Sequence, residues 1–304
     1  MNKTKILETL QKTVDDNRIL TDEPMKNHTS FKIGGPADFL VLPEKMEEIT
    51  ETVKSLKREK IPYMIIGNAS NLLVRDKGIR GVVIKLGESY NRVTIEGTRV
   101  TAESGILLSR LAKRIAKASL KGFEFASGIP GSLGGAVFMN AGAYGGEMKD
   151  VITSVKALDD RGRVITFRND ELELGYRSSI LQKKEYAVLE VVMELETGSP
   201  EEIYGKIQEL DQKRTTKQPI HLPSAGSVFK RPEGYFAGKL IEDSNLKGCR
   251  VGGAEVSTLH SGFIVNQGGA TAQDVIDLVE KVQKTVKEQF GVDLERELRI
   301  IGEE

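Results

Sequence analysis

The sequence predicts an α+β protein with more than one domain. Apolar residues recur at helical spacing in several stretches, and β-rich runs joined by tight turns predict hairpins between them. The length of 304 residues is sufficient for two or three domains of ordinary size. The sequence also contains three glycine-bearing turns, from which a bound ligand is predicted below.

The first half of the chain alternates helices with strands. An amphipathic helix is expected within residues 1–16, and a second at 46–60 carries Ile49, Val53 and Leu56 on one face. A helix is also expected at 107–119. The expected strands are "IPYMIIG" at 61–67, "GVVIKL" at 81–86 and "YAVLEVVMEL" at 186–195. Two hairpins are expected as well, at 91–105 and at 151–167.

The pattern changes at Gly198-Ser199-Pro200, which places a domain boundary near residue 199. The predicted domains are 1–199, itself split near residue 88, and 200–304. A charged helix at 201–215, an irregular loop at 218–234 and short strands at 250–266 are expected in the second domain. Thr271 and Asp274 form a capping box that opens a helix ending at Gly291, and "LERELRIIG" is expected to be the last strand.

Composition excludes several classes of function. Lys+Arg and Asp+Glu both number 44, so the chain has no excess of one charge with which to bind nucleic acid or an anionic membrane. The single Cys249 excludes an intrachain disulfide and a cysteine-based metal cluster. The sequence shows neither a signal peptide nor an apolar run of the ~20 residues that span a bilayer. We therefore expect a cytoplasmic protein without a metal site.

The segment "ASGIPGSLGGAVFMNAGAYGGE", residues 126–147, contains seven glycines in 22 positions. Its spacing differs from the dinucleotide fingerprint G-x-G-x-x-G, and no strand immediately precedes it, so a Rossmann unit is not supported. Clustered glycine indicates positive φ or close backbone approach. A tight packing loop and a ligand cradle both explain the segment at this level.

Two further turns favour the ligand. "GNASNLLVRD" at 67–76 follows a predicted strand and offers successive small residues whose N–H groups suit an anion, although an ordinary Asn-rich turn has the same composition. "TSFKIGGPADFLVLP" at 29–43 adds Gly34-Gly35-Pro36. Three uncharged glycine-bearing turns predict a large ligand held by backbone amides, such as a dinucleotide with a fused ring system.

Six ordered motifs carry a family resemblance. "NHTSFKIGGPAD", "IIGNASNLLVRD", "GIPGSLGGAVFMNAGAYGGE", "GYRSS", "PSAGSVFKRP" and "ERELRIIG" together resemble the UDP-N-acetylenolpyruvoylglucosamine reductase family over residues 28–302. The resemblance is to its shorter branch (type II), which lacks a tyrosine-bearing insertion. It implies the FAD-binding fold of the vanillyl-alcohol-oxidase and p-cresol-methylhydroxylase type, with two α+β subdomains, followed by a smaller α+β substrate-binding domain.

The resemblance also implies which residues bind FAD. Side chains would be absent from the glycine segments because the pyrophosphate and flavin occupy their volume. The implied FAD-binding residues are Gly67, Asn68, Ala69, Ser70, Asn71, Leu72, Gly128, Ile129, Pro130, Gly131, Gly134, Gly135, Asn140, Ala141, Gly142 and Tyr144.

The carboxy-terminal half supplies the implied chemistry. On residue type alone Ser227 is a structural serine, and Arg177 and Glu297 are surface charges. By resemblance Ser227 is the proton donor: hydride passes from flavin N5 to C3 of the enolpyruvyl group, and Ser227 protonates C2. Arg177 suits the enolpyruvyl carboxylate. Glu297 either polarises that carboxylate with Arg177 or positions a water.

The expected substrate contacts are Lys230 and Arg231 for the diphosphate of a UDP-sugar, with Tyr176 and Tyr235 as lesser candidates. Arg231 stands where many family members have asparagine, which changes the local geometry of the substrate site. Among the three histidines none is favoured as a ligand. No obligate protein partner is expected.

The resemblance implies an NADPH-dependent enzyme of bacterial peptidoglycan synthesis. We expect NADPH and the UDP-sugar to use one cleft in turn, which gives ping-pong kinetics. Two alternatives stay open from sequence: an FAD oxidase of the same fold acting on a small alcohol, and a flavin-binding module without catalysis.

Overall fold

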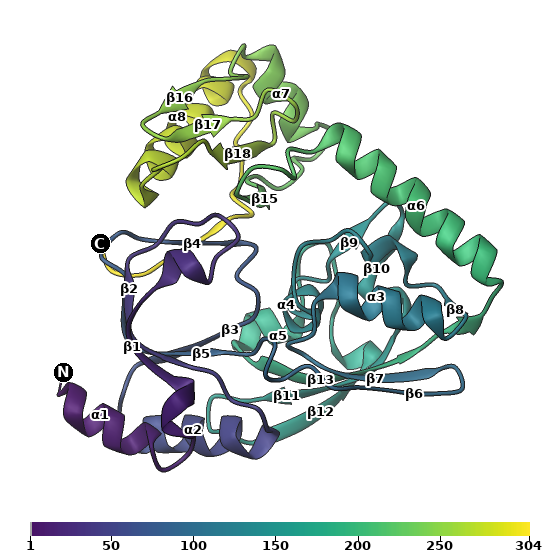
Figure 1. The fold of residues 1–304 in the computed structure, drawn as a ribbon. Helices are drawn as coiled ribbons and strands as arrows, with labels where there is room; N and C mark the ends of the chain where they lie inside the picture. The colour runs from purple at the N-terminus through teal and green to yellow at the C-terminus, as the bar shows by residue number, and fades with distance from the viewer. Residues whose placement is uncertain (1) are drawn as a thin grey trace. The chain divides into compact units, whose positions relative to one another are not determined.

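A computed structural model of the chain describes residues 2–304 and confirms a mixture of helices and strands (Figure 1). The α-helices are α1 (Lys3–Leu10), α2 (Met46–Arg58), α3 (Leu108–Lys117), α4 (Leu133–Phe138), α5 (Ile180–Lys184), α6 (Pro200–Lys217), α7 (Ala237–Asp243) and α8 (Ala272–Phe290). The longer strands are β1 (Ile19–Pro24), β2 (Pro36–Val41), β3 (Tyr63–Ile66), β5 (Ile79–Lys85), β6 (Val93–Glu96), β7 (Arg99–Glu103), β11 (Ile152–Leu158), β12 (Val164–Arg168), β13 (Ala187–Glu194), β15 (Ser224–Ser227) and β18 (Phe263–Asn266). The short strands are β4 (Leu72–Val74), β8 (Leu120–Lys121), β9 (Gly142–Ala143), β10 (Gly146–Glu147), β14 (Glu196–Thr197), β16 (Arg250–Val251), β17 (Ala254–Val256) and β19 (Arg299–Ile301).

The chain divides into two compact units, neither of which is continuous in sequence. Unit 1 comprises Met1–Thr21, Phe39–Asn68 and Gly81–Arg214. Unit 2 comprises Asp22–Asp38, Ala69–Arg80 and Thr215–Glu304. Each unit is described below by itself. The domain boundary expected near residue 199 stays a prediction.

Unit 1 contains a five-stranded antiparallel sheet in the order β12-β11-β13-β7-β6. The two predicted hairpins form its ends: β6 pairs with β7 through Glu96 and Arg99, and β11 pairs with β12 through Leu158 and Val164. Helices α3 and α4 pack their apolar residues with this sheet in one core cluster. Leu111 of α3 is fully buried there, as its helical spacing predicts.

A second core cluster of unit 1 joins α1, α2 and the parallel pair β3 and β5. The predicted apolar face of α2 is confirmed, since Ile49, Val53 and Leu56 are all fully buried. Ile6 of α1 contributes to the same cluster. Alternating charged positions leave the opposite face of α2 in solvent.

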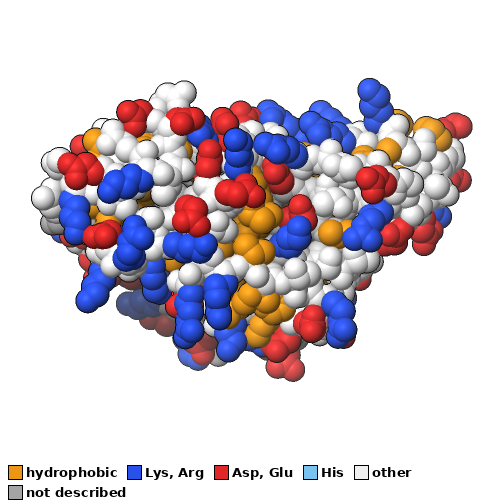
Figure 2. Space-filling view, turned by 90° about the horizontal axis from the view of Figure 1, so that it is seen from below, with side chains coloured by type: hydrophobic (Ala, Val, Ile, Leu, Met, Phe, Trp, Pro, Cys, Tyr) orange, Lys and Arg blue, Asp and Glu red, His pale blue; other side chains and the backbone are white. Residues whose placement is uncertain are grey.

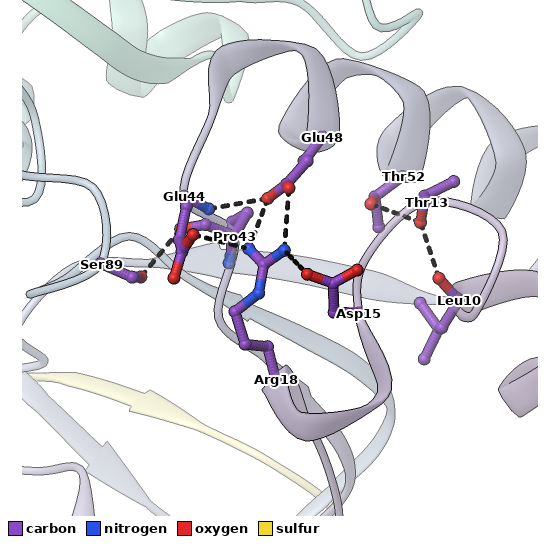
Figure 3. A network of polar contacts seen from close by, with 9 residues as sticks. All are labelled: Leu10, Thr13, Asp15, Arg18, Pro43, Glu44, Glu48, Thr52 and Ser89. Carbon is purple, nitrogen blue, oxygen red and sulfur yellow. Dashed lines mark hydrogen bonds and ion pairs between the residues drawn. The ribbon is translucent and has the colours of Figure 1, made fainter.

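Arg18 holds the start of α2 to the short turn before β1 (Figure 3). Its guanidinium donates to both carboxylate oxygens of Glu48, at 2.6 and 2.9 Å, and to Asp15 at 2.9 Å. Because the Arg18 side chain is only 11% exposed, these charge-assisted bonds replace the water that it loses on burial. The bond to Arg18 holds the pKa of Glu48 below its ordinary value.

Unit 2 contains the antiparallel sheet β15-β18-β17-β16 and the long helix α8. The predicted ends of α8 are confirmed: Thr271 and Asp274 form a reciprocal capping box, and Gly291 adopts the left-handed conformation (φ 69°). The carboxylate of Asp76 also accepts from the N–H groups of Ala272 and Gln273 in the first turn. This helix is therefore capped both locally and by a distant loop.

One expectation for unit 2 is wrong, and another is confirmed only in part. The loop expected at 218–234 contains β15, a strand whose small residues Ser224–Ser227 give no β signal and whose pairing comes from β18. The expected last strand is shortened to β19, Arg299–Ile301, which pairs in parallel with β4. Leu294 and Leu298, which precede β19, are nevertheless buried.

The surface carries both charge signs. Figure 2 shows one face on which basic and acidic side chains are interspersed, with hydrophobic side chains in small groups. Within residues 2–304 no helix combines the length and the apolar character needed to cross a membrane. The same residues contain no cluster of three or more His, Cys, Asp or Glu suited to a metal ion.

Candidate active site

The glycine segment of unit 1 lies against the turn between β7 and α3. The N–H groups of Leu133 and Gly134 donate to the carbonyls of Ile106 and Ser104, both at 2.8 Å, and the N–H of Leu108 donates to Gly131 at 3.0 Å. These bonds fix the start of α4, which begins with Ser132 at its N-cap. The predicted residues Gly128–Gly135 thus form one ordered backbone path.

Close packing surrounds several of the predicted cofactor glycines, and Gly67 and Gly134 are two examples. A Cβ built on Gly67 would lie 2.1 Å from Ser132 Oγ, and one built on Gly134 would lie 2.8 Å from the Cβ of buried Ser104. At Gly135, in contrast, a Cβ would meet only Ser132 Oγ, at an ordinary 3.8 Å. At Gly134 the protein itself therefore leaves little room for a side chain, and the exclusion of side chains by a bound cofactor stays a prediction.

The end of the segment is a two-residue hairpin, β9 and β10, with Tyr144 and Gly145 at its tip. Both tip residues have positive φ, 54° and 91°, which is the geometry that a tight antiparallel hairpin favours. The Tyr144 ring is 45% exposed, and the Arg214 guanidinium of α6 lies 5.8 Å from its centroid. Burial lowers the pKa of Arg214, an effect that Tyr144 opposes.

Arg177 occupies a tight turn in unit 1. Gly175 and Ser178 exchange two backbone hydrogen bonds, at 3.1 and 3.2 Å, and Arg177 between them has φ 51°. The carbonyl of Arg177 accepts from Gln182 Nε2 at 3.3 Å. The neighbouring Tyr176 ring, 57% exposed, lies 5.1 Å from the Arg177 guanidinium carbon. Two predicted site residues thus share one turn, in which Tyr176 is exposed and Arg177 is half-buried.

Ser227 and Glu297 lie on adjoining segments of unit 2. Ser227 ends β15 opposite Phe263 of β18, and the carbonyl of the next residue, Val228, accepts from Glu297 N at 2.8 Å. Both Ser227 and Glu297 are half-buried. Gly226, with φ 76°, turns the chain just before the serine. The structure therefore brings together two residues that are 70 positions apart in sequence.

The loop Ala69–Leu72 is attached to the Glu297 segment within unit 2. Asn71 Nδ2 donates to the Glu297 carbonyl at 3.1 Å, and Arg299 N donates to the Asn71 carbonyl at 3.1 Å. Ala69 adopts a left-handed conformation with φ 49°. Gly67 and Asn68, which precede this loop, belong to unit 1, where Asn68 N donates to Ser132 Oγ at 3.3 Å.

The predicted substrate residues of unit 2 have local partners. Lys230 pairs with Glu295. Arg231 lies with its guanidinium 4.0 Å from the Phe236 ring centroid and donates to the Tyr235 carbonyl at 3.3 Å. Arg231, Tyr235 and Phe236 are exposed. A diphosphate would compete with these contacts for the two cations.

Known proteins resemble the whole chain. A protein of Alkaliphilus oremlandii named UDP-N-acetylenolpyruvoylglucosamine reductase is 60% identical to this chain over 304 residues, which is 100% of both chains. A protein of the same name from Clostridioides difficile is 51% identical over 100% of both chains. This chain belongs to the UDP-N-acetylenolpyruvoylglucosamine reductase family.

Domain models and solved structures agree with membership in the reductase family. Residues 218–301 match the family's C-terminal domain, and residues 37–168 match an FAD binding domain. The crystal structure of the Thermus caldophilus reductase has TM-score 0.79 and 37% identity, covering 93% of this chain and 97% of that one. A 4-ethylphenol oxidase from Gulosibacter chungangensis has TM-score 0.51 at 15% identity over 64% of this chain and shares the fold alone. The predicted family, FAD-binding fold and FAD cofactor are confirmed.

The residues present fit FAD. Ser104 Oγ is buried without a hydrogen-bond partner and lies 3.4 Å from the position of a Gly134 Cβ. An unpaired buried hydroxyl costs free energy, so it indicates a group that is to be bound beside it. Gly135 leaves an open, exposed position on the same backbone path. Neutral hydroxyls and backbone suit a dinucleotide, whose phosphates an adjacent carboxylate would repel.

Sequence reasoning did not single out Ser104, Ser132 or Arg214. Ser132 lies within the quoted glycine segment, and its position before α4 was the available signal. Ser104 and Arg214 carry no local signal, because each acquires its place beside the glycine segment only through folding. Which of the predicted residues contact FAD stays a prediction.

Proposed function

We propose that this chain reduces the enolpyruvyl double bond of UDP-N-acetylglucosamine enolpyruvate to give UDP-N-acetylmuramate, with NADPH as reductant. Full-length identity of 60% to a reductase of that name supports the proposal. The reaction consumes NADPH and one proton, and it saturates one carbon–carbon bond. A role in peptidoglycan precursor synthesis in the cytoplasm follows as part of the same proposal.

The observation that carries the mechanism is the backbone bond from Glu297 to Val228, next to Ser227. It joins the two backbone segments that carry Ser227 and Glu297. When bound, FAD supplies hydride transfer from NADPH to C3 of the substrate. The Ser227 hydroxyl then donates its proton to C2. An aliphatic hydroxyl is a weak acid, so this transfer requires the strongly basic carbon that forms there.

Arg177 is proposed to bind the enolpyruvyl carboxylate. Its guanidinium forms a planar fork that matches a carboxylate, and it stabilises the negative charge that spreads onto that group before C2 is protonated. Glu297 acts with it, either by polarising the carboxylate or by holding a water beside Ser227. Lys230 and Arg231 are proposed to meet the diphosphate, after release of their contacts to Glu295 and Phe236.

Separate measurement of the two half-reactions tests Ser227 as the proton donor. Ser227→Ala should leave flavin reduction by NADPH unchanged, while reoxidation of the flavin by the enolpyruvyl substrate falls by about 10²–10⁴-fold, the usual contribution of general acid catalysis. Ser224→Ala, in the same strand, is the matched control and should leave both rates unchanged. Anaerobic stopped-flow absorbance measures each step. An unchanged reoxidation rate in Ser227→Ala would refute the proton-donor assignment.

Use of one cleft by NADPH and the UDP-sugar predicts ping-pong kinetics. Double-reciprocal plots against one substrate, at several fixed concentrations of the other, should give parallel lines. Intersecting lines would show a ternary complex and exclude successive use of the same cleft.

A further inference from the structure

Arg177 is held in a backbone conformation that is unfavourable for a residue with a side chain. Its φ of 51° lies in the left-handed region, where a long side chain costs conformational free energy that surrounding contacts must supply. The turn Gly175–Ser178 is closed by its own two backbone bonds. A functional arginine in such a turn requires an external support to fix its direction.

Asn140 provides a support from the glycine segment. The residue is 1% exposed and itself left-handed, with φ 42°, a conformation that asparagine tolerates. Its Nδ2 donates to the Gly175 carbonyl at 3.1 Å and to Glu147 Oε2 at 2.6 Å, and its Oδ1 accepts from Lys149 N at 3.0 Å. Both amide hydrogens are therefore used to join the Arg177 turn to the β10 strand.

Glu147 places a carboxylate beside the same turn. Its side chain pairs with Lys149 Nζ at 2.5 Å and is 31% exposed. The bond to Lys149 and, to a smaller extent, the bond to Asn140 and the charge of Arg177 hold the pKa of Glu147 below its ordinary value, against the effect of burial. Glu147 is thus ionised at neutral pH, and the bond that it accepts from Asn140 is charge-assisted.

We propose that Asn140 and Glu147 are positioning residues for Arg177. Asn140 joins the Glu147 carboxylate to the Gly175 carbonyl, and these two bonds fix the turn that carries Arg177. The guanidinium is thereby oriented before the substrate carboxylate arrives, so less ordering is left for the binding step. This inference rests on the proposed function, in which Arg177 binds the enolpyruvyl carboxylate.

The first test is Glu147→Gln, which removes the charge and keeps an oxygen that accepts from Asn140. We expect flavin content, thermal midpoint and NADPH-driven flavin reduction to stay at the parent values. Reoxidation by the enolpyruvyl substrate should slow by about tenfold, as for removal of other orienting partners, with a higher substrate concentration at half-maximal rate. Glu209→Gln is the matched control: it removes a carboxylate between two lysines on α6 and should change neither rate.

A purely structural role predicts a different result. In that case Glu147→Gln would lower flavin content, thermal midpoint and both half-reactions together. Equal loss of both half-reactions, or parent-like reoxidation, would overturn the proposal.

A second variant pair tests the contact itself. Asn140→Asp keeps the shape and the left-handed preference but sets a second carboxyl against Glu147, so reoxidation should slow. Adding Glu147→Gln restores a donor and an acceptor across the pair, which then carries a single negative charge. The double variant should therefore reoxidise faster than the product of the two single effects predicts. If the effects of the two substitutions on the reoxidation rate are strictly additive, the contact between Asn140 and Glu147 does not contribute to this step.

Arg177→Lys separates this inference from the proposed function. If Arg177→Lys reoxidises its flavin like the parent, the assignment of Arg177 fails and the positioning proposal fails with it. If Arg177→Lys is impaired while Glu147→Gln is not, only the positioning proposal fails.

Discussion

Two neighbouring glycines, Gly134 and Gly135, separate the packing role of the glycine segment from its role in cofactor binding. Both lie in α4, but an added methyl group meets different surroundings at each. At Gly134 it would lie 2.8 Å from Ser104 Cβ and 3.3 Å from the Ser104 carbonyl oxygen. At Gly135 it would enter open space 3.8 Å from Ser132 Oγ. Alanine at the two positions therefore forms a matched pair.

The two alanine variants should differ in stability before any ligand is considered. Replacing glycine by alanine inside a helix stabilises it by up to about 1 kcal/mol. Gly135→Ala should show part of this gain in flavin-free protein. Overpacking in a tight interior costs about 1–3 kcal/mol, so Gly134→Ala should be destabilised by about 0–2 kcal/mol after the same gain is subtracted. The backbone of Ser104 leaves little room for relief.

Although Gly135→Ala should stabilise the flavin-free protein, it should weaken the binding of FAD. If FAD contacts the exposed backbone at Gly135, the added methyl group should weaken its affinity by about tenfold or more, which corresponds to ~1.4 kcal/mol. Urea unfolding of the flavin-free protein measures stability, and fluorescence titration with FAD measures affinity. Parent-like FAD affinity in a fully folded Gly135→Ala variant would refute the placement of the cofactor along this path.

Three further predictions concern stability. Arg18→Met should lower the free energy of unfolding by about 2–3 kcal/mol, because the Glu48 carboxylate, 17% exposed, loses its charged partner and keeps only the bond from Glu44 N; a change under about 0.5 kcal/mol in urea unfolding would contradict this role. The cost should depend on pH: the folded pKa of Glu48 lies below its ordinary 4.5, so its contribution is present above that value and is lost as pH falls through the folded pKa. Arg18→Met and the parent should therefore converge in acid, and a gap that stays constant between pH 7 and pH 3 would exclude this linkage. Asp76→Ala should cost about 1–2 kcal/mol by uncapping α8, seen as a lower thermal midpoint, while Asp277→Ala on the same helix should cost less; equal effects would show that the cap is unimportant.

Elements with a strong local signal could be predicted from sequence. The capping box Thr271 and Asp274 and the stop at Gly291 bound α8 correctly, because a cap is formed by residues only a few positions apart. Both hairpins of unit 1 were likewise predictable from their turns. In contrast, β15 has no β-rich residues, and its pairing with β18 joins positions about 40 residues apart. Local preference does not encode such a partner.

The family and the cofactor could be predicted from the linear sequence, because six motifs occur in order along the chain; the chemistry that the motifs imply stays a prediction. Tertiary structure decided what surrounds each residue. It bonds Glu297 to Val228 beside Ser227 and ties Asn71 to the Glu297 carbonyl across 226 positions. It also shows that Gly134 is small because Ser104 is close, whereas Gly135 faces open space. Distances between segments arise only when hydrophobic burial packs the chain, so no spacing within a motif specifies them.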